Sequence, residues 1–228
     1  MPQRLLRAAL ALAALLCATI ASADPHDSAH GEQETLSESV CRLIEISARA
    51  QSLPVEFLTR LIWRESGFQP EVTSPAGAHG IAQFMPGTAR ERDVSNPFDP
   101  EEAIPKAADL IADLKRQFGN LGLAAAAYNA GPARVASWIA GGYLPNETRD
   151  FVMIVTRHSV EDWAAPAAVA LTDEALFPEP TCVKATNAVR PAGQGEVAEA
   201  PLVAPWGVQI SGSFSKAAAL AAYARTRA

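Results

Sequence analysis

The residue with the clearest chemical potential is Glu65, in the last turn of a segment with helical periodicity that Gly67 ends. Phe57, Leu61 and Glu65 are spaced four residues apart, so the carboxyl group continues an apolar stripe. Burial on this stripe and the helix dipole at this end both favour the neutral acid and raise its pKa. A neutral carboxylic acid near pH 7 can protonate a glycosidic oxygen. A solvent-facing carboxylate paired with a neighbouring arginine is the alternative, and position alone favours neither.

Two further segments place polar groups beside apolar residues where an element ends, namely residues 80–86 (GIAQFMP) and 127–131 (AYNAG). A helix that ends in Tyr128-Asn129 can present a phenol and an amide while Gly131 takes the turn. Such groups beside aromatic surface suit a sugar that carries N-acetyl groups. Each segment alone is a weak signal, because many helices end in this way.

Taken together and in this order, Glu65-Ser66-Gly67, residues 80–83 and residues 127–131 resemble the catalytic domain of soluble-type lytic transglycosylases, over about residues 38–165. The resemblance implies a mostly α, goose-type lysozyme-like fold and cleavage of the glycan strands of bacterial peptidoglycan. It makes Glu65 the single catalytic acid/base and Ser66 the residue that helps to orient the carboxylate. The substrate-binding positions that it implies are Gly80, Ile81, Gln83, Met85, Tyr128, Asn129 and Phe151, with Ile81 and Met85 lining the cleft.

One position departs from the family pattern. After residues 145–149 (PNETR) the family usually has a tyrosine near the catalytic glutamate, whereas this chain has Phe151. A phenylalanine fills the volume but cannot hydrogen-bond to Glu65, which leaves that carboxyl group less well oriented or more readily protonated. A core residue of its helix is the alternative interpretation of Phe151, and activity is still expected.

Hydrolytic glycosidases generally use two carboxylates, and the sequence offers Glu65 no obvious partner, since Glu56, Glu71 and Asp93 lie in segments without a matching motif. The reaction of this family needs no second carboxylate. By resemblance, Glu65 protonates the oxygen of the MurNAc–GlcNAc β-1,4 bond and then accepts the proton of the MurNAc 6-hydroxyl, which closes a 1,6-anhydro ring. An attached acceptor replaces a bimolecular step and has a large entropic advantage. This reaction requires no metal and no cofactor.

Three alternatives remain open at this point. A lysozyme-like hydrolase would have the same fold and acid, with water as the acceptor. A non-catalytic peptidoglycan-binding or assembly protein would keep the cleft, and Phe151 and the C-terminal residues 205–228, which resemble part of a SPOR domain, give this alternative some support. A lytic enzyme dedicated to a secretion or flagellar apparatus would have further cell-wall partners, for which the sequence carries no readable motif.

Helices must position these residues. Residues 35–38 (TLSE) have capping-box spacing for a first helix, and Pro54 opens a second helix that Gly67 ends. A short helix is expected near Ile81 to Met85. Further helices are expected at 99–118, 121–128, 132–139 and 147–158, with one more turn from Ser159 through Trp163. No strand pattern precedes residue 200, so the domain is predicted to be mostly α.

Composition limits the classes of protein that remain. Of the 228 residues, 49% are hydrophobic and 19% charged, which is enough apolar material for a core. Lys and Arg total 19 against 25 for Asp and Glu, a net charge of −6. With no long basic run, nucleic acid is not an expected partner.

Residues 1–23 predict a signal peptide. Two arginines precede an apolar run from Ala8 to Ile20, and three small residues end at Ala23. The run is too short to span a bilayer comfortably. We therefore expect cleavage after Ala23, a flexible lead-in over residues 24–34 and a periplasmic location. A lipoprotein attached through Cys17 is the alternative, which the bulky leucine before it disfavours.

Export would leave two cysteines, Cys41 and Cys182. An even pair in an oxidising compartment predicts a disulfide that ties the first helix to the segment that ends the domain. Two separately buried thiols are the alternative.

Beyond the predicted catalytic domain at 35–182, residues 183–204 have the composition of a linker. Residues 205–228 then resemble the opening strand and helix of a SPOR domain, a family that binds peptidoglycan strands stripped of their peptides. A lone strand and helix cannot bury a sheet face, so a truncated remnant is the favoured interpretation. A tether, or a segment that pairs with another module, is the alternative.

Overall fold

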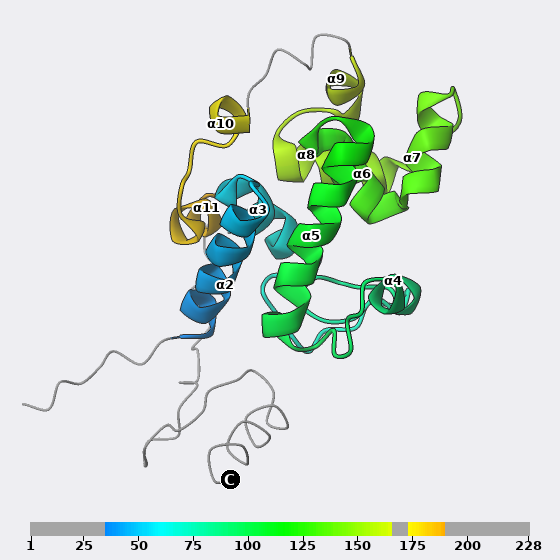
Figure 1. Ribbon diagram of the computed structural model, residues 1–228. Helices are drawn as coiled ribbons and strands as arrows, with labels where there is room; N and C mark the ends of the chain where they lie inside the picture. Colours follow the sequence, from blue (N-terminus) through cyan, green and yellow to red (C-terminus); the bar gives the residue numbers. More distant parts are fainter. Residues whose placement is uncertain (1–34, 166–172, 190–228) are drawn as a thin grey trace, which may run out of the picture. The chain divides into compact units, whose positions relative to one another are not determined.

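The structure is a computed structural model that describes residues 35–165 and 173–189, a set of helices joined by loops (Figure 1). The predicted signal peptide, the lead-in, residues 190–204 of the predicted linker and the SPOR-like segment lie outside the described residues. Within the described ranges, β pairing is limited to isolated bridges of His79 with Thr73 and with Phe84. The domain is mostly α, as the sequence predicts. None of the helices in these ranges is long and apolar enough to cross a membrane.

Helix α2 (Leu36–Ala50) begins, and helix α3 (Val55–Ser66) ends, where local signals predict. Helix α2 starts with a capping box, in which Thr35 Oγ1 accepts from the Glu38 backbone N–H and Glu38 Oε2 accepts from that of Thr35. Helix α3 ends at Gly67, whose φ of 62° is the left-handed conformation that glycine adopts readily.

Helix α6 (Leu121–Ala130) is the centre of the domain. It packs against α5 (Pro100–Phe118), α7 (Pro132–Ile139), α8 (Asn146–Thr156) and α9 (Val160–Ala164). Its first seven residues, Leu121–Ala127, are all buried, as expected of a helix that is apolar on every side. Small side chains permit this close packing, and a Cβ atom on Gly122 would lie only 1.9 Å from the Trp163 ring.

The predicted helix at 81–85 is wrong. These residues form a turn, and helix α4 (Pro86–Glu91) begins only after it. Gln83 has a φ of 50°, outside the helical region. The backbone N–H groups of His79 and Phe84 each donate a hydrogen bond to the carbonyl oxygen of the other residue. Pro86 therefore starts the helix at the position where its missing N–H costs nothing.

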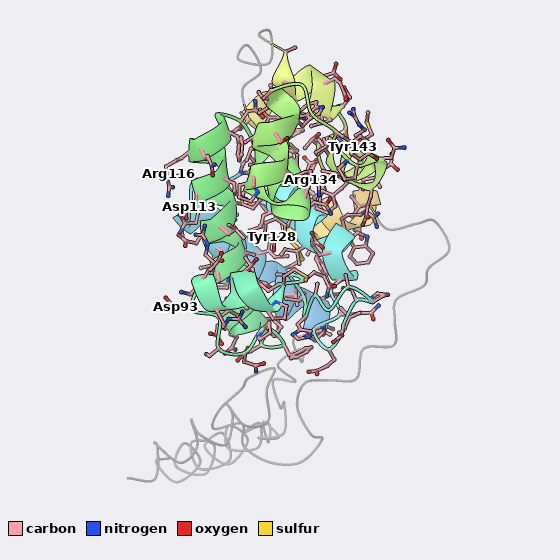
Figure 2. All side chains as sticks on the ribbon, turned by 90° about the vertical axis from the view of Figure 1, so that its right-hand side faces the viewer. Asp93, Asp113, Arg116, Tyr128, Arg134 and Tyr143 are labelled. Atoms are coloured by element: carbon pink, nitrogen blue, oxygen red, sulfur yellow. A yellow bond between two sulfur atoms is a disulfide. The ribbon has the colours of Figure 1, made fainter. Side chains whose placement is uncertain are left out.

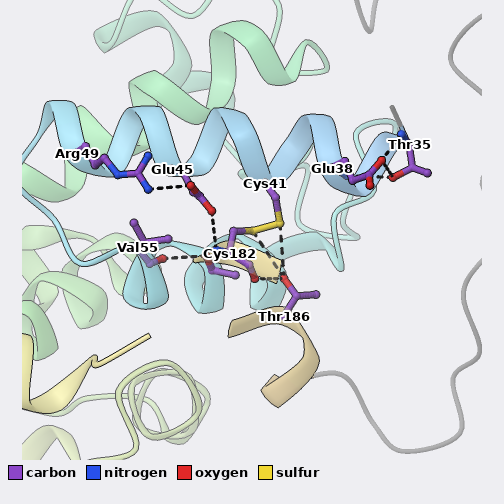
Figure 3. The surroundings of a disulfide bond; sticks show 9 residues. Thr35, Glu38, Cys41, Glu45, Arg49, Val55, Cys182 and Thr186 are labelled. Atoms are coloured by element: carbon purple, nitrogen blue, oxygen red, sulfur yellow. Dashed lines mark hydrogen bonds and ion pairs between the residues drawn. A yellow bond between two sulfur atoms is a disulfide. The ribbon is translucent and has the colours of Figure 1, made fainter. Parts of the chain in front are cut away.

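The predicted linker start at residue 183 is also wrong. After the short helix α10 (Asp173–Leu176), helix α11 (Cys182–Val189) runs through the first seven residues assigned to the linker and packs against α2 and α3. Ala185 and Thr186 are buried there. Cys182 is joined to Cys41 of α2 by a disulfide with a Cα–Cα distance of 5.2 Å, and its backbone N–H donates to Glu45 (Figure 3). The linker prediction failed because this stretch becomes a helix through tertiary packing that its own composition does not encode.

Candidate active site

Glu65 is partly buried at the end of α3. It continues the apolar stripe of Phe57 and Leu61, which are both completely buried. Burial raises the pKa of its carboxyl group to about 8, the neighbouring Arg64 charge acts in the opposite direction, and the Glu147 carboxylate raises it further. Glu65 is therefore mostly neutral at pH 7. The largest cause is desolvation, the effect expected from its position on the apolar stripe.

The first turn of α8 lies near Glu65 and the end of α6. Helix α8 packs against both α3 and α6, and Thr148 Oγ1 donates to Asn129 Oδ1 at 2.8 Å. The carboxylate of Glu147, one residue earlier, lies close enough to Glu65 to affect its pKa. Sequence reasoning missed Glu147 as a neighbour of Glu65, although it lies in the segment that precedes Phe151. Its proximity to Glu65 depends on the packing of α8 against α3, which no pattern within the segment indicates.

Tyr128 connects α6 to the loop at 80–85. Its hydroxyl group donates to the Ala82 carbonyl oxygen at 2.7 Å. Burial, together with the negative charge that Glu65 can carry, raises the pKa of the Tyr128 phenol well above its usual value, so the group stays a proton donor. Figure 2 looks onto the side of the domain where α4 and α7 lie and shows Tyr128 near the middle of this view.

Two residues with positive φ, Gly80 and Gln83, determine the shape of the loop at 80–85. Gly80 has a φ of 75° and passes so close to the next segment that a Cβ atom would lie 1.7 Å from the Pro97 carbonyl oxygen. Gln83 also has a positive φ, and its Nε2 donates to the Gly80 carbonyl oxygen at 2.8 Å. Met85 ends the loop with 45% of its surface exposed.

The structure corrects part of the predicted substrate contacts. Gly80, Ile81 and Phe151 are buried and have almost no surface to offer a ligand. The cause for Ile81 is the turn, which directs residues 81 and 82 into the core. The Ser66 hydroxyl group donates to the Ile62 carbonyl oxygen at 3.4 Å, within its own helix.

The remaining predicted residues have accessible surface and come from segments that meet. Gln83 and Met85 lie on the loop, and Tyr128 and Asn129 end α6. Asn129 Oδ1 accepts one hydrogen bond from Thr148, which leaves the second lone pair of this oxygen and the amide NH₂ group for a ligand. Within residues 35–165 and 173–189, no three His, Cys, Asp or Glu side chains are grouped to hold a metal ion.

In this mostly α domain, a partly buried glutamic acid that is mostly neutral at pH 7 lies near the Tyr128 phenol, and a neutral carboxylic acid can act as a general acid. Residues 42–149 match the family described as Transglycosylase SLT domain. This match over residues 42–149 confirms the predicted resemblance to lytic transglycosylase catalytic domains.

Relatives of known name are similar over the same part of the chain. The soluble lytic murein transglycosylase of Escherichia coli is 36% identical over 100 residues, 39% of this chain and 16% of that protein. The membrane-bound lytic murein transglycosylase F of Pseudomonas fluorescens is 31% identical over 128 residues, 51% of this chain and 26% of that protein. The chain therefore spans only about a sixth to a quarter of these relatives.

Among solved structures, the 70 kDa soluble lytic transglycosylase from Escherichia coli is similar with a TM-score of 0.48 and 26% identity, over 60% of this chain and 25% of that chain. The complex of a 70 kDa soluble lytic transglycosylase with bulgecin A has a TM-score of 0.47 and 29% identity, over 53% of this chain and 24% of that chain.

Proposed function

We propose that this protein is a periplasmic peptidoglycan lytic transglycosylase that cleaves the MurNAc–GlcNAc β-1,4 bond and forms 1,6-anhydro-MurNAc. The observation that carries the proposal is Glu65, a glutamic acid whose pKa is raised to about 8 inside a transglycosylase SLT domain. The substrate is the peptidoglycan glycan strand. Gln83, Met85, Tyr128 and Asn129 bind it, and Ser66 supports the catalytic helix end.

In the proposed reaction Glu65 acts twice. The neutral acid donates its proton to the glycosidic oxygen as the bond from that oxygen to the anomeric carbon breaks. Positive charge builds at the anomeric carbon, where the substrate's own N-acetyl carbonyl assists. The MurNAc 6-hydroxyl then attacks that carbon and its proton passes to Glu65, which restores the acid. A carboxylate with a pKa near 8 is a much stronger base than an ordinary one, which suits this second step.

Glu147 favours one rival function. A second carboxylate near the acid is the feature that hydrolytic glycosidases use to activate water, and Glu147 is exposed at the first turn of α8. A lysozyme-like hydrolase would assign Glu147 the role of base. In the transglycosylase, its role is to raise the pKa of Glu65.

Product analysis separates these functions. The chain without its predicted signal peptide, residues 24–228, would be incubated with purified peptidoglycan sacculi, and the released muropeptides identified by mass spectrometry. We expect products with anhydro-MurNAc ends from the parent chain and no product from Glu65→Gln. Glu147→Gln should release a smaller amount of product, still with anhydro ends. Glu71→Gln, a change at an exposed carboxylate outside the site, is the matched control and should leave the products unchanged.

Reducing ends in place of anhydro ends, lost in Glu147→Gln, would establish the hydrolase. No product from the parent chain, with binding to sacculi retained, would make the protein a peptidoglycan-binding protein and overturn the proposed mechanism.

A further inference from the structure

Between Asn129 and Thr148 the chain leaves the candidate site and returns to it. The two ends of this excursion are joined by the 2.8 Å hydrogen bond from Thr148 Oγ1 to Asn129 Oδ1. Residues 130–147 run from the last residue of α6 through α7 and the loop that follows to the first two residues of α8, and are called the α7 arm. Figure 1 shows α7 at the side of the domain away from α2 and α11.

The arm is firmly held although most of it is exposed. Val135 and Leu144 are its completely buried anchors. Trp138 is half-buried, and the Arg149 guanidinium group lies 5.7 Å above its ring while pairing with Glu161 of α9. The turn that ends α7 is also fixed, because the Gly142 N–H donates to the Ser137 carbonyl oxygen at 2.9 Å. The arm is therefore anchored to the domain at several points.

The outer side of the arm carries binding groups that the domain itself does not use. Tyr143 is 67% exposed and Ile139 54% exposed. Arg134 is exposed and forms no ion pair with any residue in the described part of the chain. In the view of Figure 2, the labels of Arg134 and Tyr143 lie successively farther from that of Tyr128. An exposed aromatic ring can pack against a ligand, and a guanidinium group can bind a carboxylate through two parallel hydrogen bonds.

We propose that the α7 arm extends the saccharide cleft, so that Tyr143 stacks on a sugar ring beyond those at Tyr128 and Asn129, and Arg134 binds a carboxylate carried by the glycan strand. This inference rests on the proposed function. A glycan strand is the ligand that we expect on the arm, because the arm starts and ends at the candidate site. Helix α7 begins directly after the end of α6 that holds Asn129, and the arm ends at Glu147, near Glu65. An eight-residue helix adds about 12 Å of surface along its axis.

The two residues recognise different features of the strand. A ring face packs against the C–H groups of any sugar, so Tyr143 contributes to binding of neutral oligosaccharides. Arg134 contributes only where the ligand has an anionic group, such as the lactyl carboxylate of peptide-free MurNAc, with which guanidinium forms charge-assisted hydrogen bonds.

Binding to the Glu65→Gln chain tests this, since that change stops turnover. Isothermal titration would use N-acetylglucosamine oligomers of increasing length, from dimer to hexamer, and peptide-free glycan strands. We expect affinity to rise with length, and Tyr143→Ala to weaken the hexamer about tenfold while leaving the dimer unchanged. Arg134→Ala should leave the hexamer unchanged and weaken the peptide-free strands about tenfold.

Two changes on α2 are matched controls for loss of an exposed side chain. Ile46→Ala controls for Tyr143→Ala and Arg49→Ala for Arg134→Ala, and neither should affect binding. If the Glu65→Gln chain binds no saccharide, the proposed function fails and this inference fails with it. If it binds longer oligomers more tightly and Tyr143→Ala preserves that gain, the function stands and the role of the arm is overturned.

Discussion

Arg60 Nε donates to Glu56 Oε1 at 2.9 Å in a buried ion pair one turn apart on α3. The pair joins three parts of the domain. Glu56 also accepts a hydrogen bond from the Glu179 backbone N–H at 3.1 Å and pairs with Arg157, at the end of α8, at 3.2 Å. Arg60 in turn donates to the Ile154 carbonyl oxygen. The part of α3 that precedes Glu65 thus contacts both α8 and the segment that contains Glu179.

This network makes a prediction about stability. Glu56→Ala would leave the buried Arg60 guanidinium group without its partner, so we expect the free energy of unfolding to fall by about 3–5 kcal/mol. Arg157→Ala removes a partner whose side chain is 54% exposed, and should cost about 1 kcal/mol or less. Urea unfolding followed by circular dichroism measures both. Equal losses in the two variants would mean that burial of the pair does not decide its contribution.

The two charged neighbours of Glu65 predict opposite shifts in the pH dependence of activity. Catalysis needs the neutral acid, so the rate should fall as pH rises through about 8. Removing the Glu147 charge removes an influence that raises the pKa of Glu65, so Glu147→Gln should move this fall to lower pH. Arg64→Gln should move it to higher pH. Initial rates of muropeptide release from pH 5 to 10 would test this.

Shifts in the same direction for both variants would contradict the electrostatic account. Glu71→Gln is the matched control again, because this carboxylate is exposed and outside the site. Its pH profile should coincide with that of the parent chain.

The raised pKa of Glu65 also has a cost in stability. The pKa is about 4.5 in the unfolded chain and about 8 in the folded protein, so the folded state binds more protons between these values. The contribution of Glu65 to stability is therefore largest below pH 4.5 and is lost as the pH rises through 8. The upper bound for this loss is about 5 kcal/mol, and solvent screening of the partly exposed group reduces it to about 2 kcal/mol.

Glu65→Gln carries no charge at any of these pH values and should escape this loss. We expect the variant to match the parent chain in stability at pH 4 and to exceed it by about 2 kcal/mol at pH 9. Denaturant titrations at the two pH values give the comparison. A constant difference between the variant and the parent chain across this range would show that Glu65 titrates near its ordinary pKa.

The disulfide predicts a large effect of reduction. In the chain-entropy model, cross-linking residues 141 positions apart stabilises the folded state by about 4–5 kcal/mol. Adding dithiothreitol should lower the unfolding temperature of the parent chain. The double variant Cys41→Ala, Cys182→Ala should already unfold at the lower temperature and should not respond to the reagent. A parent chain that does not respond to dithiothreitol under unfolding conditions would contradict the prediction.

Local signals predicted the elements whose ends depend on neighbouring residues. The capping box at Thr35 and Glu38 and the glycine at 67 place helix boundaries with interactions only a few residues long. The stripe that ends in Glu65 likewise follows from helical periodicity. These features could be predicted because the groups that determine them are close in the sequence.

The remaining features depend on contacts between distant segments. The turn at 81–85 exists because His79 pairs with Phe84 and Gly80 passes against Pro97. Helix α11 is stabilised by burial against α2 and α3, and the effect of Glu147 on Glu65 requires α8 to pack on α3. No pattern within one segment encodes such contacts, which is why Ile81 was predicted to line the cleft although it is buried.

Gly80 and Gly77 form a matched pair that tests the turn itself. Both have a positive φ, 75° and 85°, so alanine strains the backbone at either position. Only Gly80 also lacks room, since its Cβ atom would lie 1.7 Å from the Pro97 carbonyl oxygen, whereas the Cβ position at Gly77 has nothing within 4 Å. Gly80→Ala must displace the loop whose Ala82 carbonyl oxygen accepts the Tyr128 hydrogen bond.

We therefore expect Gly77→Ala to cost about 1 kcal/mol of stability and to keep its activity on sacculi. Gly80→Ala should cost about 2 kcal/mol or more and should lose most of its activity even at temperatures where it remains folded, because the loop carries Gln83 and Met85. Urea unfolding and muropeptide release measure the two effects separately. Equal activity in the two folded variants would mean that the position of this loop does not matter for the reaction.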